Sequence, residues 1–413
     1  MAGRDSSANR WLLPDGVEQA LPGEARRIEA LRRRVLDLFD AWGYELVITP
    51  LIEYLESLLA DADDELNLQV FKLTDQSSGR MLGIRADMTP QVARMDAHML
   101  HPHGINRLCY AGQVLKARCE GVSGSRSPLQ FGAEIYGHEG VGSSIEVIRL
   151  MLAALDAAGV GGVHLGLGHV GICRGFAQAA GLAPAPSERL LDLLNTKAAH
   201  EIEAYLREQG VARGQIDWFV SLADLYGGAD VLEEARRRFA GAVPQVGDAL
   251  DELQSVADAL ARSCPGIQLH CNLAELPGYH YETGLVFAGY VPSIGQEIAR
   301  GGRYNNVGES FGKARPAVGF SSDLKLLAAL GDDAAAETAS ASVETAASAQ
   351  TPAAPVAAPI CAPPDDDPAL HEKIASLRAA GERVAVQFDA AAPAAGARAL
   401  VRDGGKWVVT EPS

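Results

Sequence analysis

The sequence predicts an α+β protein in which an antiparallel sheet is flanked by helices, with a helical insertion and a small C-terminal α/β module. Three observations lead to this fold class. Residues 25–42 carry apolar side chains at helical spacing and are followed at once by a strand pattern. Strand and hairpin patterns recur at 70–85 and 105–136, and about 187–262 is helix-forming with little strand signal. A chain of 413 residues is long enough for two or three domains.

The N-terminal elements follow from periodicity and from residues that favour turns. The first helix places apolar residues three and four positions apart, with arginines on the opposite face, and Gly43 ends it. A strand over 44–50 follows and stops at a proline. A Ser- and Gly-containing turn predicts a hairpin over 70–85. Thr89 is expected to cap a helix with proline at its first position, running toward Met99.

The rest of the core alternates between strands and a long helical segment. Two strands, 105–115 and 129–136, are joined by a Ser- and Gly-rich loop. The helical insertion over about 187–262 comes next, and strand character returns at 284–290. We expect the last helix of the core to begin near Ser322.

The composition changes after this helix. Residues 334–364 are rich in Ala, Pro, Ser and Thr without periodicity, and they cannot bury enough apolar surface to offset the entropy of ordering them. We therefore predict a flexible linker between a core domain, 1–333, and a small C-terminal module, 365–413. The elements expected within the module are a helix at 370–380, a strand at 383–388 and a hairpin at 399–410.

The charge balance argues against a nucleic-acid ligand. With 36 Lys and Arg against 53 Asp and Glu, the net charge is −17, and the average field repels a polyanion. The N-terminal residues lack the apolar segment of a secretory signal, and no apolar run approaches the ~18 residues of a membrane span. The six cysteines form no C-x-x-C pair, which is typical of reduced thiols. We expect a cytoplasmic protein that binds neither nucleic acid nor membrane.

Two short motifs carry little weight. The segment 166–171 matches the dinucleotide fingerprint G-x-G-x-x-G, but no βαβ unit surrounds it, so a glycine-permissive turn explains it better. His101 and His103 have no Cys or carboxylate companion at ligand spacing, so no metal site is expected. The loop with which phosphoribosyltransferases hold phosphoribosyl pyrophosphate is missing. We expect no cofactor and no phosphoribosyl transfer by the chain itself.

Several separate segments resemble class II histidyl-tRNA synthetases, over residues 15–330 in all. The first of them is similar to the helix and strand with which that family builds its dimer interface. The resemblance implies a class II synthetase core. The matching segments are 21–27 with 42–50, 84–89, 130–134, 281–284, 301–304 and 316–320.

The resemblance also implies a histidine-binding pocket. Asp87 stands where the family has Glu, and Glu282 replaces the second residue of the family's tyrosine pair. The residue types alone support the same ligand, because carboxylates, an amide and hydroxyls suit the ammonium, carboxylate and imidazole of a small zwitterion. The candidate histidine-binding residues are Asp87, Thr89, Gln130, Glu134, Tyr281 and Glu282.

The residues with which the synthetase family handles ATP are replaced. Its phosphate-clamping Arg and its adenine-reading Glu fall at Lys116 and Arg118, and its adenine-stacking Phe falls at Pro128. Its γ-phosphate Arg falls at Leu326, and its histidine-specific catalytic Arg at Pro277. Loss of one preorganised charge-stabilising group commonly costs ~3 kcal/mol or more in the transition state. This degenerate ATP site implies no adenylation and no catalytic residues.

A histidine pocket, a lost ATP site and a tail too short for an anticodon-binding domain are together similar to the paralogous family of ATP phosphoribosyltransferase regulatory subunits. The similarity implies a non-catalytic role in the first step of histidine biosynthesis, with L-histidine as allosteric effector. It also implies a partner, the short-form catalytic subunit, in a hetero-oligomer around homodimers of this chain. Two alternatives stay open: an active histidyl-tRNA synthetase, and another histidine-binding regulatory protein.

Overall fold

The computed structural model describes residues 12–60, 64–100, 103–118, 124–274, 282–292, 294–305, 314–338, 358–389 and 397–410. Its largest feature is a nine-stranded sheet, in which every strand pair from β5 across to β7 is antiparallel. Toward the edges of the sheet, β1 pairs in parallel with β5 and β9 pairs in parallel with β7, while the edge strand β8 pairs antiparallel with β9. The predicted fold class is confirmed. In spatial order the strands are β1 (Glu45–Leu46), β5 (Asn106–Gln113), β6 (Leu129–Tyr136), β12 (Ala317–Asp323), β11 (Glu297–Arg303), β10 (Leu285–Tyr290), β7 (His164–His169), β9 (Gln268–Asn272) and β8 (Tyr226–Gly227).

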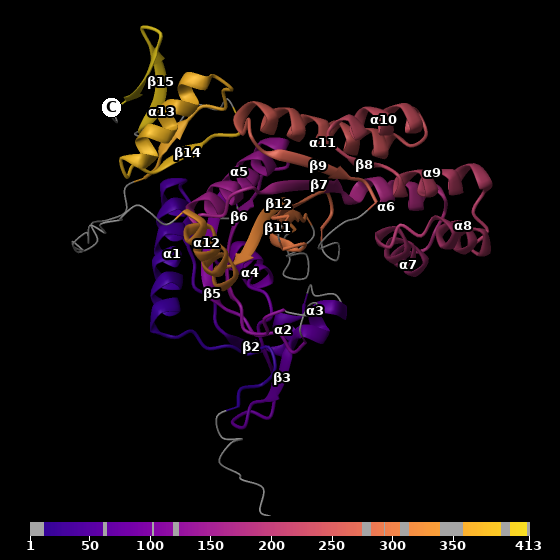
Figure 1. Ribbon diagram of the computed structural model, residues 1–413, viewed down its shortest axis with the longest axis horizontal. Coiled ribbons are helices and arrows are strands. Elements are labelled where there is room, and N and C mark those ends of the chain that lie inside the picture. The colour runs from indigo at the N-terminus through magenta and orange to yellow at the C-terminus, as the bar shows by residue number, and fades with distance from the viewer. Residues whose placement is uncertain are drawn as a thin grey trace, which may run out of the picture.

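Helices cover one face of this sheet and enclose the main hydrophobic core (Figure 1). Alternate strand residues, such as Phe131, Ala133 and Ile135 of β6, point into this core. Phe39 packs against Phe131 and edge-on against Phe320, with ring centroids 6.1 and 6.0 Å away. The first helix therefore buries its apolar stripe, as predicted. The helices that contribute most are α1 (Pro22–Ala41), α5 (Val141–Ala157), α6 (Val170–Ala179), α11 (Pro244–Ser263) and α12 (Leu324–Thr338).

The opposite face of the sheet is partly covered by helix α4 (Thr89–Met99), which packs on Leu108, Tyr110 and Tyr136 through its own apolar residues. Residues directly opposite each other on paired strands point to the same face. One such row crosses six neighbouring strands, and half of its members are glycines. The side chains of Glu134 and Glu282 lie over two of them, Gly319 and Gly302. The row is Leu108, Glu134, Gly319, Gly302, Val286 and Gly168.

A second, three-stranded sheet lies at the far end of the core, at the bottom of Figure 1. The predicted hairpin is confirmed, but the strand predicted over 44–50 is wrong in extent. Only Glu45–Leu46 is a strand there, and a separate strand begins at Ile52 to pair with the hairpin. The elements of this part are β2 (Ile52–Tyr54), α2 (Leu55–Leu58), α3 (Asp64–Gln69), β3 (Phe71–Thr74) and β4 (Met81–Ile84).

The segment expected to be a helical insertion is occupied by helices, apart from the short strand β8 that pairs with β9. It enters the chain between α6 and β9 and projects to the right in Figure 1. Its core is apolar, with Phe176 of α6 stacked on Trp218 at 5.1 Å. The helices before α11 are α7 (Pro184–Asn195), α8 (Ala199–Glu208), α9 (Arg213–Ala223) and α10 (Asp230–Phe239).

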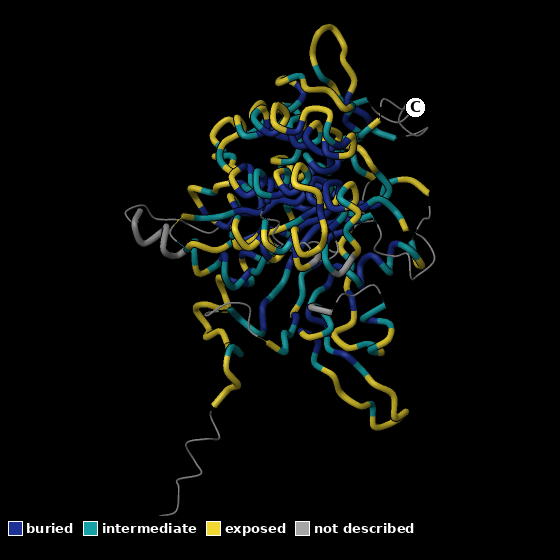
Figure 2. The backbone as a smooth tube through the Cα atoms, turned by 90° about the vertical axis from the view of Figure 1, so that its right-hand side faces the viewer, coloured by how far each residue is buried: buried dark blue, intermediate teal, exposed yellow. Residues whose placement is uncertain are grey.

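The C-terminal module is a four-stranded sheet with one helix and its own small hydrophobic core (Figure 1, yellow). The range predicted as a linker needs correction at both ends, because α12 continues to Thr338 and a strand begins at Ile360. The positions between them, 339–357, lie outside the described residues. Figure 2 shows buried residues gathered in the interior and exposed ones on the projecting loops. The module consists of β13 (Ile360–Ala362), α13 (Pro368–Ala379), β14 (Val384–Val386), β15 (Ala399–Asp403) and β16 (Lys406–Thr410).

Candidate functional site

The centre of the candidate site is the carboxyl group of Glu134, on the face of the sheet that helix α4 partly covers. The side chain is only 1% exposed and accepts hydrogen bonds from three hydroxyl groups. Tyr110 and Thr89 donate to Oε1 at 3.0 and 3.2 Å, and Tyr304 donates to Oε2. The hydroxyl of Tyr136 lies 3.2 Å from that of Tyr304 and extends the network. Buried carboxylates require such partners, because desolvation without them is costly.

Asp87 and Gln130 form the second part of the site, next to this network. The amide nitrogen of Gln130 donates to Asp87 Oδ1 at 2.7 Å, and its oxygen accepts from the backbone N–H of Met88 at 2.9 Å. Asp87 Oδ1 also accepts from the backbone N–H of Thr89 at 3.1 Å. Thr89 thus joins the two carboxylates, since its hydroxyl reaches Glu134. Four of the six predicted histidine-binding residues are brought together.

Two paired glycines form the floor of the site. Gly319 of β12 lies opposite Gly302 of β11, and a Cβ at Gly319 would stand 1.5 Å from Glu134 Oε2. A Cβ at Gly302 would stand 2.7 Å from Cγ of Glu282. Glu282 is buried, and its backbone carbonyl accepts from Arg174 at 2.8 Å. The side chains of Glu134 and Glu282 therefore flank the glycine floor.

Arg303 fixes the strand that carries this floor to the start of helix α5. Its guanidinium donates to the backbone carbonyls of His138 and Gly140 at 3.0 and 2.9 Å, and to the hydroxyls of Ser143 and Ser144 at 2.9 and 2.8 Å. The side chain is buried at 4% exposure, and burial lowers its pKa. The guanidinium of Arg303 therefore has a structural role, because these groups of the protein accept its hydrogen bonds.

Burial raises the pKa of Glu134 to about 8. The hydrogen bonds from Tyr304, Tyr110 and Thr89 act in the opposite direction, whereas the negative charge of Asp87 adds to the rise. A carboxyl group with this pKa is mostly protonated at neutral pH. A cationic ligand group beside Glu134 would favour its ionised form.

The described positions of the predicted degenerate ATP site lie after strand β5, before strand β6 and in helix α12. The backbone N–H of Lys116 donates to the carbonyl of Arg126 at 2.8 Å, and the Arg126 side chain donates to the carbonyl of Lys116 at 3.0 Å; Arg118 is exposed. Pro128 is buried and accepts from the Val114 N–H, and Leu326 packs against the main core. The structure thus has apolar side chains at Pro128 and Leu326, two positions of the predicted degenerate ATP site.

Other predicted positions and motifs lie outside the described residues or away from this network. Tyr281 and Pro277 lie outside the described residues, as does His101. The G-x-G-x-x-G segment forms strand β7 and the start of α6, where the His169 side chain caps the helix by accepting from Gly171 N–H at 3.0 Å.

Within the described ranges, no group of His, Cys, Asp and Glu side chains is arranged to hold a metal ion. None of the helices in that part of the chain has the length and apolarity needed to span a bilayer.

Sequence reasoning missed the hydroxyl partners of Glu134. Tyr110 lies in a predicted strand, but its contact with Glu134 follows only from the register in which β5 and β6 pair, and the sequence does not give that register. Tyr304 belongs to the G-G-R-Y segment, but its role as a donor to Glu134 was not predicted.

Comparisons with known proteins identify the family of the chain. The family model for histidyl-tRNA synthetase matches residues 16–327, and the model for the ATP phosphoribosyltransferase subunit HisZ C-terminal domain matches 357–410. An ATP phosphoribosyltransferase regulatory subunit from Thioalkalivibrio sulfidiphilus is 49% identical over 411 residues, covering 98% of this chain and 100% of that protein. The chain belongs to the family of ATP phosphoribosyltransferase regulatory subunits. It is therefore a non-catalytic subunit of that enzyme, which decides against the alternative of an active synthetase.

Solved structures show the same relationship for this regulatory subunit. A protein from Bacillus halodurans described as an ATP phosphoribosyltransferase regulatory subunit/histidyl-tRNA synthetase has a TM-score of 0.69 at 25% identity, with 95% of both chains covered. A chain of the ATP phosphoribosyl transferase (HisG:HisZ) complex from Thermotoga maritima has a TM-score of 0.53 at 18% identity, covering 74% of this chain and 98% of that one. The latter likeness concerns the fold alone.

Proposed function

We propose that this regulatory subunit binds L-histidine in the pocket of Asp87, Thr89, Gln130 and Glu134, and that histidine feedback on ATP phosphoribosyltransferase acts through this pocket. The observation that carries the proposal is the buried carboxyl group of Glu134 above a floor of paired glycines. Such a group is costly to bury unless a ligand or a proton compensates it. Histidine supplies an ammonium group and ring N–H groups, which carboxylates accept in strong charge-assisted hydrogen bonds.

The neighbouring residues supply selectivity for the rest of the ligand. Gln130 can donate as well as accept, and the hydroxyl of Thr89 can do the same. Glu282, on the other side of the glycine floor, adds a further acceptor. Tyr281 stays a predicted member of the set on the strength of the sequence resemblance. A site with donors and acceptors on several sides distinguishes a zwitterion from simple cations.

Substitution of Asp87 by Ala tests whether the pocket is the sensor. We expect histidine to inhibit the reconstituted complex about 10- to 100-fold more weakly, because a hydrogen bond to a charged group is lost. Phosphoribosyl transfer is measured against histidine concentration, with Glu203→Ala as a control that removes an exposed carboxylate of the helical insertion. An unchanged inhibition curve for Asp87→Ala would rule out this pocket.

The proposed partner is the short-form catalytic subunit of ATP phosphoribosyltransferase. The name shared by the relatives supports this partner, as does the composition of the Thermotoga maritima complex. The degenerate ATP site is in accord with a division of labour in which another chain carries the chemistry. Coupling of about 1–3 kcal/mol between the histidine pocket and the catalytic site would suffice for feedback, and it must be reciprocal.

We also propose that the chain forms a homodimer through the strip around strands β1 and β2. Large apolar side chains are exposed there, Ile48 at 85%, although monomeric proteins rarely expose a contiguous apolar patch of large size. This strip is the part that resembles the dimer motif of the synthetase family. The exposed residues are Leu46, Ile48, Leu51 and Ile52.

Ile48→Asp should convert the dimer into a monomer, because a charge would be buried without a partner in the interface. Sedimentation velocity on the isolated chain measures the change. Val401→Asp, which alters an exposed valine of the C-terminal module, serves as the matched control and should leave the dimer intact. A dimer that persists in Ile48→Asp would place the interface elsewhere.

The proposed location of the subunit is the cytoplasm. The five cysteines in the described part of the chain are all free thiols, and free thiols persist in a reducing compartment.

A further inference from the structure

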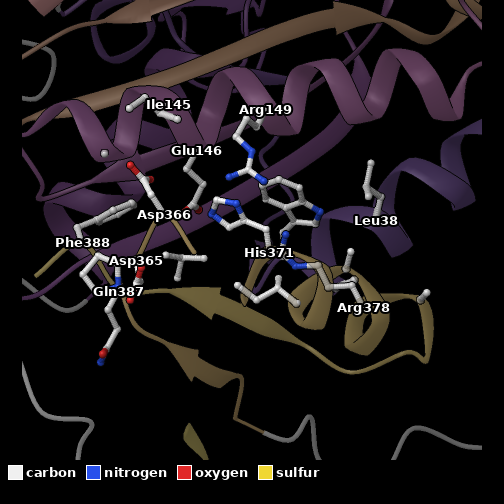
Figure 3. A pocket seen from close by; sticks show the side chains of 18 of the residues that line it. Leu38, Ile145, Glu146, Arg149, Asp365, Asp366, His371, Arg378, Gln387 and Phe388 are labelled. Atoms are coloured by element: carbon white, nitrogen blue, oxygen red, sulfur yellow. The ribbon is translucent and has the colours of Figure 1, made fainter. Parts of the chain in front are cut away.

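A large cleft lies between the C-terminal module and the core, on the helix-covered side of the sheet. Its volume is about 860 Å³, within the range of small-molecule sites, which occur preferentially between domains. The core contributes side chains from α1 and α5, and the module contributes α13 and the end of β14 (Figure 3). The side chains that line the cleft include Leu38, Trp42, Ile145, Arg149, His371 and Arg378.

Two arginines from opposite walls converge on this cleft. Arg149 comes from α5 and Arg378 from α13, with His371 between them in Figure 3. Among the residues that the structure describes, neither arginine forms an ion pair, and the side chain of Arg149 has no hydrogen bond. Arg378 lies over the Trp42 ring at 3.8 Å and donates from Nη2 to the carbonyl of Val384 at 2.7 Å. Its Nε is buried without a partner in the described chain.

The carboxylates of the cleft are already engaged or exposed. Glu146 accepts from Arg107 at 2.8 and 3.0 Å and from Tyr44 at 3.1 Å. Asp366 pairs with Arg262 at 3.2 Å. Asp365 accepts from the backbone N–H of Asp367, and Asp37 is exposed to solvent. The positive charges of Arg149 and Arg378 are therefore not neutralised within the cleft by a direct partner.

The positive charge of Arg149 affects two other basic groups of the cleft, Arg378 and His371. Burial lowers the pKa of Arg378; Glu146 opposes this effect, and the positive charge of Arg149 adds to it. Burial also lowers the pKa of His371, and Arg149 again adds to the decrease, against the acidic residues Asp365 to Asp367. A bound anion would relieve the repulsion between these groups. Guanidinium groups favour carboxylate and phosphate in particular, because they can donate two parallel hydrogen bonds.

We propose that the cleft binds a small anionic ligand, with its carboxylate or phosphate group held between Arg149 and Arg378 and its apolar part against Leu38 and Ile145. The ligand bridges the core and the C-terminal module, since each contributes one arginine. This site is distinct from the histidine pocket, because α5 covers the face of the sheet opposite to Glu134. The proposal therefore does not depend on the proposed function.

Calorimetric titration of the full chain with three separate probes, inorganic phosphate, AMP and L-histidine, tests the proposal. The histidine titration uses an Asp87→Ala background, which removes the contribution of the other pocket. We expect at least one probe to bind, and Arg149→Gln to weaken that binding about 10- to 100-fold. Loss confined to phosphate and AMP identifies a phosphate ligand, and loss confined to histidine identifies a carboxylate.

Two further variants keep the test decisive. Arg383→Gln removes the ion pair with Asp40 between the module and the core, neither residue of which lines the cleft, and it should leave binding unchanged. Arg149→Lys keeps the charge but not the bidentate donor, so it should bind more weakly than the wild type even if Arg149→Gln fails to fold. The proposal is overturned if no probe binds in the millimolar range, if the Arg149 variants bind as the wild type does, or if Arg383→Gln loses as much affinity as they do.

Discussion

Gly319→Ala is expected to destabilise the protein by about 3 kcal/mol or more and to abolish histidine binding in the pocket. The added Cβ would lie 1.5 Å from Glu134 Oε2 and 2.9 Å from the carbonyl oxygen of Ala133, so neither the side chain nor the strand can stay in place. Displacement of Glu134 breaks its hydrogen bonds with Tyr110, Thr89 and Tyr304. A buried carboxyl group without these partners carries a large desolvation penalty.

Urea unfolding of the isolated chain and calorimetry with L-histidine measure the two effects. Gly247→Ala is the matched control, since a Cβ at this position of helix α11 meets no atom within 4 Å. The control should be neutral or slightly stabilising, because Ala favours helix over Gly by up to about 1 kcal/mol. Equal stability of the wild type and Gly319→Ala would mean that Glu134 does not lie over the glycine floor.

The sequence was sufficient to group much of the polar cluster around Glu134, because strand alternation places Gln130 and Glu134 on one face. The helix that follows Thr89 then brings Asp87 against that face. What alternation does not provide is the register between strands distant in sequence. The contact of Glu134 with Tyr304 spans 170 positions and depends on the pairing of β6, β12 and β11. Only the folded sheet reveals that the paired glycines are the floor of the site.

The incorrect predictions have local physical causes. Thr89 is the first residue of its helix and not its cap, because its hydroxyl is taken by Glu134 while Asp87 accepts its N–H. A polar side chain that hydrogen-bonds a residue distant in sequence is not available for the local helix cap that its position in the sequence predicts. The strand expected over 44–50 is short because Arg85 donates to the carbonyls of Thr49 and Pro50, where a neighbouring strand would otherwise pair.

The cleft beneath the C-terminal module had no counterpart in the sequence analysis. Arg149 lies in the middle of helix α5 and Arg378 in the last turn of α13, and neither belongs to a motif. The module is held against the core by contacts between segments far apart in the chain, such as Arg383 with Asp40 and Arg107 with the carbonyl of Val386. Charged residues that come together only when two domains pack cannot be matched to each other from their spacing in the sequence.

Glu134→Gln is expected to change the pH dependence of both stability and ligand binding. The carboxyl group has an ordinary pKa of 4.5 and a pKa of about 8 in the folded protein, so the folded state binds the additional proton. This group therefore contributes its full stability below about pH 4.5, and the contribution is lost as the pH rises toward and through 8. The loss amounts to at most about 1.4 kcal/mol per pH unit.

Glutamine cannot ionise, so Glu134→Gln should lack this loss and should be more stable than the wild type at pH 8 without ligand. Denaturant unfolding at pH 6 and pH 8 measures the difference. Tyr304→Phe provides a test of the opposite sign, because it removes a hydrogen bond that lowers the pKa of Glu134 and so should shift the loss to higher pH. The same slope in the wild type and in Glu134→Gln would contradict the raised pKa.

Histidine binding should show the complementary trend, because the ammonium group of the ligand pairs with the ionised form of Glu134. Affinity of the wild type is expected to rise between pH 6 and pH 8, and Glu134→Gln should bind about 10- to 100-fold more weakly at pH 8. The variant also corrects for the ligand's own titration, since the imidazole loses its proton in this pH range for both proteins. If the two affinities change in parallel with pH, Glu134 does not sense the ligand's charge, and histidine must be recognised elsewhere.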